Sequence, residues 1–81
     1  MRINLLLFAI YRDLAGGGEL QLDLPDGATV RDLLAMLRGR GDGLGRLPAE
    51  PAVAVNRDYA ALDTRLCDGD DVALLPPVAG G

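Results

Sequence analysis

The stretch TVRDLLAMLRG, residues 29–39, decides the fold because it is the clearest amphipathic helix in the chain. Its apolar residues recur at i, i+3, i+4 and i+7, the spacing of one helical face. They are Val30, Leu33, Leu34 and Leu37. Thr29 is placed to cap the amide of Asp32, and Gly39 ends the pattern. This stretch predicts one helix with a single apolar face.

Short apolar runs on both sides of this helix predict the strands of a sheet. Residues 2–11, RINLLLFAIY, are apolar on both alternating faces, which is typical of a strand buried on both sides. Residues 20–24 alternate, and the glycines of AGGGE at 15–19 predict a hairpin turn between these two strands. Further strands are predicted at residues 51–55 and 71–75, with a turn at 56–58 and a brief strand or extended segment at 60–62.

This order predicts an α+β domain, a mixed four- to five-stranded sheet packed on one main helix, with residues 39–51 as a surface loop. Alternate strand residues are then expected to face the helix: Ile3, Leu5, Leu7, Val53, Val55, Val72 and Leu74. The opposite face is expected to carry Leu6, Phe8, Ala73 and Leu75. One helix covers one face, so the second apolar face is expected to meet a partner.

Composition excludes several classes of function. The chain has 81 residues, a formal charge of −4 and no lysine, so we expect a single domain that does not bind nucleic acid. With no histidine and one cysteine, Cys67, it has no internal disulfide, histidine zinc site or histidine-based catalytic group. We expect no metal and no stand-alone enzyme activity. The apolar run at 5–11 is too short to cross a bilayer, so a cytoplasmic protein without membrane contact is predicted.

The chain ends on PPVAGG, residues 76–81. Two prolines keep the root of this segment extended and outside the sheet, and two glycines leave its tip free and narrow. The general alternative is a frayed terminus. The combination predicts instead a folded domain at residues 1–75 followed by an extended, flexible tail at 76–81, shaped to enter the active site of another protein.

Two stretches resemble the family of molybdopterin synthase small subunits. These are VNRDYAALDTRLCDGDDVALLPPVAGG, residues 55–81, and LLFAIYRDLAG, residues 6–16. The segments DGD, PPV and the final GG carry the likeness, which spans essentially the whole chain. The resemblance implies a ubiquitin-like β-grasp fold.

The resemblance also implies a sulfur carrier with no bound cofactor. In that family an E1-like adenylyltransferase uses ATP to adenylate the terminal glycine, here Gly81, which follows Gly80. A sulfur donor such as a cysteine desulfurase or rhodanese-type protein then converts it to a thiocarboxylate, 1-thioglycine. The tail enters the large subunit, in a heterotetramer of two small and two large subunits, and donates sulfur to cyclic pyranopterin monophosphate.

Partner-binding positions carried over from that family fall on both the domain and the tail. They are Phe8, Arg12, Tyr59, Leu75, Pro76, Pro77, Val78 and Ala79. Phe8 and Leu75 also belong to the face that strand alternation leaves uncovered.

Two alternatives remain open at this stage. One is a sulfur carrier for another pathway, such as thiamine, cysteine or transfer-RNA thiolation. The other is a ubiquitin-like modifier joined through Gly81 to lysines of other proteins.

Overall fold

The computed structural model describes residues 1–40, 45 and 51–75. Most of the predicted loop and the whole predicted tail, residues 76–81, lie outside the described residues. The elements, in chain order, are β1 (Arg2–Leu7), α1 (Ala9–Ala15), β2 (Glu19–Asp23), α2 (Val30–Arg38), β3 (Ala52–Val55), β4 (Asp58–Tyr59) and β5 (Asp71–Leu75).

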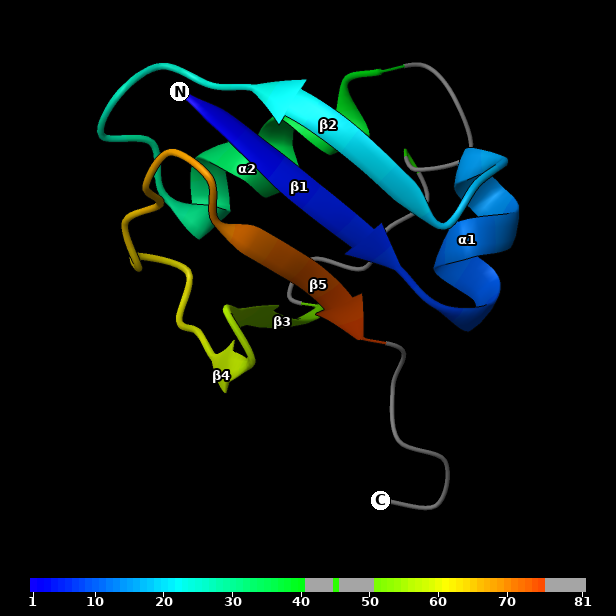
Figure 1. Ribbon diagram of the computed structural model, residues 1–81. Coiled ribbons are helices and arrows are strands. Elements are labelled where there is room, and N and C mark those ends of the chain that lie inside the picture. Colours follow the sequence, from blue (N-terminus) through cyan, green and yellow to red (C-terminus); the bar gives the residue numbers. More distant parts are fainter. Residues whose placement is uncertain (41–44, 46–50, 76–81) are drawn as a thin grey trace.

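The strands form one five-stranded mixed sheet in the order β2-β1-β5-β3-β4. β1 and β5 are parallel neighbours, and the other adjacent pairs are antiparallel. In Figure 1 helix α2 lies behind the sheet, so the opposite face of the sheet is turned towards the viewer. The predicted α+β class and its β-grasp arrangement, one main helix on one face of a mixed sheet, are confirmed.

The core lies between α2 and the sheet. All four apolar residues predicted for the inner face of α2 are buried. The strand residues predicted to face them are buried as well, except Val55, which is partly buried against the same cluster. Four core members were not predicted: Tyr11, Leu24, Ala28 and Leu66. Burying these apolar side chains provides the main driving force for folding of a domain of this size.

A capping box begins α2, and the sequence predicts one of its two hydrogen bonds, the cap of Thr29 on the Asp32 amide. The Thr29 hydroxyl accepts a hydrogen bond from the Asp32 amide at 3.3 Å, and the Thr29 amide donates to the Asp32 carboxylate at 2.9 Å. The two bonds satisfy backbone donors that would otherwise have no partner at this helix end.

We expect Thr29→Ala to lower the free energy of unfolding by about 1 kcal/mol, because the first turn of α2 loses its side-chain acceptor. Urea denaturation of the full chain measures this effect. Thr29→Ser keeps the hydroxyl and serves as the control, so it should retain most of the stability. Equal stability of the alanine variant and the unchanged protein would contradict a stabilising cap.

The predicted first strand over residues 2–11 is wrong beyond Leu7. The chain leaves the sheet after β1 and forms α1, which ends at Gly16 with a φ of +78° and an amide that donates to the Arg12 carbonyl. Tyr11 is buried in the core, and Leu14 and Ala15 pack against it. Their i, i+3, i+4 spacing before a glycine is the helical signal that the apolar run obscures.

The predicted hairpin of the first two strands is right in pairing and wrong in connection. β1 and β2 are antiparallel, with Leu5 opposite Leu20, but α1 stands between them in the chain. The brief strand predicted at 60–62 lies instead at β4, because the turn after β3 uses two residues and brings Asp58 opposite Val55.

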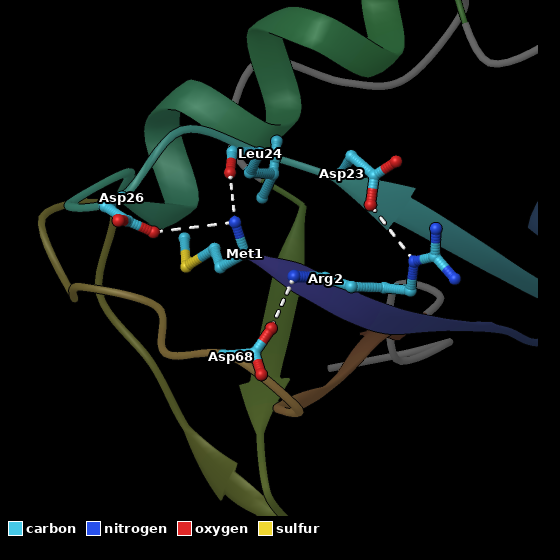
Figure 2. A network of polar contacts seen from close by, with 6 residues as sticks. All are labelled: Met1, Arg2, Asp23, Leu24, Asp26 and Asp68. Atoms are coloured by element: carbon cyan, nitrogen blue, oxygen red, sulfur yellow. Dashed lines mark hydrogen bonds and ion pairs between the residues drawn. The ribbon is translucent and has the colours of Figure 1, made fainter.

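Polar contacts attach the beginning of β1 to its neighbours (Figure 2). The Met1 ammonium donates to the Leu24 carbonyl at 2.8 Å, and the Arg2 amide donates to the Asp68 carboxylate at 2.7 Å. Arg2 Nε also donates to Asp23 at 3.0 Å, and this hydrogen bond lowers the pKa of the Asp23 carboxyl. These contacts join β1 to the end of β2 and to the loop before β5.

None of the helices in the described ranges is long and apolar enough to cross a membrane.

Candidate partner-binding site

One row of residues crosses the sheet on the face opposite α2. In the strand register Leu6 of β1 lies opposite Ala73 of β5, which lies opposite Ala54 of β3, which lies opposite Tyr59 of β4. The two central positions are alanines, and the outer positions carry larger side chains. A row that is small in the middle and large at both ends leaves a depression in the surface.

A hollow of about 430 Å³ occupies this face. Its lining consists of Leu6, Phe8, Ala54, Arg57, Tyr59, Asp71, Ala73 and Leu75. Both aromatics of this lining are exposed, since 47% of Phe8 and 84% of Tyr59 are accessible. Exposed aromatic residues beside an arginine have the composition of the central part of a protein–protein interface.

Phe8 reaches this hollow although it lies outside β1. Its backbone is extended, with φ −123° and ψ 154°, so it continues the alternation of the strand before α1 begins. Leu7 lies opposite Leu74 in the parallel pair, so the residues that follow them, Phe8 and Leu75, lie side by side at the same end of the two strands. The parallel pairing of β1 and β5 brings together residues far apart in the sequence.

Among the predicted site residues, Phe8, Tyr59 and Leu75 line the hollow, and Arg12 does not. Arg12 is exposed on α1. A Cβ atom at Gly18 would come within 3.1 Å of its Cδ atom, so the stem of Arg12 lies over the connection to β2. The predicted tail positions, from Pro76 to Gly81, lie outside the described residues.

The sequence interpretation missed Arg57 as a lining residue. It lies in the two-residue turn between β3 and β4, and Asn56 and Arg57 both have positive φ, 51° and 75°. Positive φ at both central positions is what a type I′ hairpin turn requires. The signal for a hairpin was present in the sequence, because Asn before a turn residue favours this conformation.

Asn56 fastens this turn to β5. Its side-chain oxygen accepts from the Asp71 amide at 3.0 Å, and its side-chain nitrogen donates to the Asp70 carboxylate at 2.9 Å. Its own amide donates to the Asp71 carbonyl at 2.7 Å. The turn is thus held in place at the rim of the hollow.

The lining of the hollow combines apolar and charged side chains. Within the described ranges no three acidic or cysteine side chains are grouped so as to hold a metal ion. Cys67 is a free, exposed thiol. The hollow offers apolar area, one arginine and one carboxylate, Asp71, whose Oδ1 accepts from the Asn4 side chain at 3.0 Å.

Residues 5–81 match the model of the ThiS family. The chain is 37% identical to the molybdopterin synthase sulfur carrier subunit of Chlamydomonas reinhardtii, with all of both chains covered. It is 40% identical to small archaeal modifier protein 3 of Haloferax volcanii, again over the whole of both chains. The chain thus matches, over their full length, one relative named as a sulfur carrier subunit and one named as a modifier protein.

Solved structures show the same fold. SAMP1 from Haloferax volcanii superposes with a TM-score of 0.83 at 34% identity, and both chains are covered completely. A second match, at a TM-score of 0.72 and 29% identity over the whole of both chains, comes from Helicobacter pylori. That structure is a protein–protein complex of subunits 1 and 2 of the molybdopterin-converting factor.

Proposed function

Because this chain belongs to the ThiS family, we propose that it is a sulfur carrier that serves as the small subunit of molybdopterin synthase. The observation that carries the proposal is the full-length likeness to the Chlamydomonas reinhardtii sulfur carrier subunit. The hollow supports it, because an open, largely apolar surface suits a subunit that works in a complex.

The proposed chemistry takes place at the carboxylate of Gly81. A carboxylate oxygen attacks the α-phosphorus of ATP on an E1-like adenylyltransferase, and pyrophosphate leaves. Hydrosulfide then attacks the carbonyl carbon of the acyl adenylate, and AMP leaves with the displaced oxygen. When the donor is a protein persulfide, its outer sulfur attacks instead to form an acyl disulfide, and a thiol reduces the S–S bond to release the sulfur on Gly81. The product is the thiocarboxylate, and this chain binds no cofactor itself. Gly80 and Gly81 have no Cβ, so the end of the tail fits a narrow active site.

The proposed partner surface is the hollow, and the large subunit covers it. Leu75 is both the last residue of β5 and part of the lining, so the tail begins at the edge of this surface. Six residues from Pro76 to Gly81 can reach about 20 Å when extended. A large subunit docked on the hollow would then receive the thiocarboxylate in its own active site, where cyclic pyranopterin monophosphate accepts the sulfur. Two such pairs form the proposed heterotetramer.

We expect Phe8→Ala to weaken binding to the large subunit by about 1–3 kcal/mol, because an exposed aromatic anchor at the hollow is lost. Isothermal titration calorimetry with the cognate large subunit measures the affinity. Leu62→Ala, a partly buried position outside the hollow, is the control and should leave the affinity unchanged. Unchanged binding by the Phe8 variant would contradict docking at this face.

The direct test of the function is intact-mass analysis. The full chain is incubated with its activating enzyme, ATP and a sulfide or persulfide source. The expected mass gain is the difference between sulfur and oxygen, located by fragmentation at Gly81. A chain that releases no pyrophosphate and gains no mass would contradict the sulfur-carrier proposal.

A second candidate function, a protein modifier, is favoured by the identity of 40% to a small archaeal modifier protein. In that role the activated Gly81 would be attacked by a lysine of another protein, with loss of AMP and formation of an isopeptide bond. The chain contains no lysine, so it cannot build polymers of itself on its own side chains. Proteolysis of cell lysate followed by peptide mass spectrometry would detect remnants of this tail on lysines of other proteins.

A further inference from the structure

Arg57 occupies a backbone conformation that glycine would adopt more easily. Its φ of +75° lies in the left-handed region, where a side chain crowds the backbone and where the second residue of such a turn is most often glycine. The three bonds made by Asn56 hold this turn against β5, so the strained conformation is imposed by the surroundings. Retained backbone strain of this kind points to a use for the side chain.

The Arg57 side chain lines the hollow and has no partner among the described residues. It is exposed, and it forms no ion pair or side-chain hydrogen bond with them. Asp71, the acidic member of the lining, already accepts from Asn4. An arginine in the lining of an apolar surface that also carries exposed aromatics is a frequent hot spot of an interface.

We propose that Arg57 determines partner specificity by binding a carboxylate that the large subunit places against this hollow. This inference rests on the proposed function, because it assumes docking of the large subunit. A planar guanidinium offers two parallel donors to a carboxylate, a geometry that lysine cannot reproduce. The rest of the chain carries a net negative charge, so an acidic group of a partner is favoured at Arg57 and repelled over most of the surface.

The same side chain costs the isolated domain stability. Arg57→Gly should relieve the left-handed strain and raise the melting temperature by about 2–6 °C, the range expected when one strained residue is relieved in a domain of this size. It should also weaken binding of the large subunit by at least about tenfold, as the loss of an interface hot spot does. Opposite changes in stability and affinity are a signature that a purely structural or a purely solubilising arginine would not produce.

The experiment compares full-length variants by calorimetric titration with the large subunit at low and high salt, and by thermal unfolding. Arg57→Lys keeps the charge and should bind with intermediate affinity, because the two-donor geometry is lost. Arg65→Ala removes an exposed arginine outside the hollow and controls for net charge, so its affinity should stay within about twofold of the unchanged protein. The difference in affinity for the large subunit between the Arg57 variants and the unchanged protein should become smaller as the salt concentration rises.

Binding of Arg57→Gly within about twofold of the unchanged protein, or no weaker than binding of Arg65→Ala, would overturn the inference and leave the proposed function intact. A failure of the unchanged protein to bind the large subunit would overturn both. Should the glycine variant unfold, the affinity of Arg57→Lys for the large subunit decides instead. Binding of the lysine variant within about twofold of the unchanged protein would overturn the inference, because it would show that the two-donor geometry has no role.

Discussion

Removal of Gly81 is expected to abolish activation of the chain while leaving its folding unchanged. Deletion removes about 3.3 Å of reach from the proposed tail, and a displacement of that size is expected to move the terminal carboxylate out of reach of the α-phosphorus of ATP. The described core extends from Ile3 to Leu74, so the loss of a residue at position 81 should leave the melting temperature unaltered. Pyrophosphate release with the activating enzyme measures activation.

Gly80→Val is the companion variant, because it keeps the length of the tail and adds a β-branched side chain one residue before its end. We expect it to be activated poorly as well, since the branched side chain would widen a segment that must enter a narrow site. Arg31→Ala, a substitution at an exposed position of α2, is the control and should be activated normally. Full pyrophosphate release by the chain that lacks Gly81 would rule out the terminal glycine as the reacting group.

Leu5→Ala is expected to lower the free energy of unfolding by about 2–5 kcal/mol, the largest stability effect predicted here. Leu5 is 0% exposed, and it lies in the middle of β1 between Leu20 of β2 and Val72 of β5. Truncation there leaves a cavity that strands paired on both sides cannot collapse to fill. Urea denaturation monitored by circular dichroism gives the change.

Phe8→Ala is the matched comparison, because it truncates a larger side chain on the opposite face of the same segment. Nearly half of Phe8 is exposed, so its loss should cost much less stability than the loss of Leu5. The two variants therefore separate the core face from the binding face. If Phe8→Ala proved as destabilised as Leu5→Ala and still bound the large subunit normally, the assignment of the two faces would be inverted.

The fold class and the two faces of the sheet were accessible from the sequence because they depend on local periodicity. The capping box at Thr29 and the apolar face of α2 are encoded within ten residues, and the structure has both. The last strand, Asp71–Leu75, was predicted with its observed bounds because a turn precedes it and apolar residues fill it. In β1, strict alternation identified which residues face α2.

The segment after Leu7 could not be read in the same way. A strand buried on both faces and a short helix packed on a core both appear in the sequence as apolar runs. The two can be distinguished only by the parts of the fold against which the segment packs. Tyr11 packs in the core from α1, which becomes favourable once β2 and the sheet are in place to receive it. Tertiary packing decided that choice.

The candidate site illustrates the same division. Sequence by itself determined that Phe8 and Leu75 lie on the uncovered face, since alternation follows from the pleat of a single strand. Only the tertiary structure decided that Ala54 and Tyr59 join them, because register between strands distant in the chain depends on the whole sheet. It also decided that Arg57 faces the hollow while Arg12 lies over Gly18, because the direction of each arginine follows from a turn and a helix whose geometry is set by their neighbours.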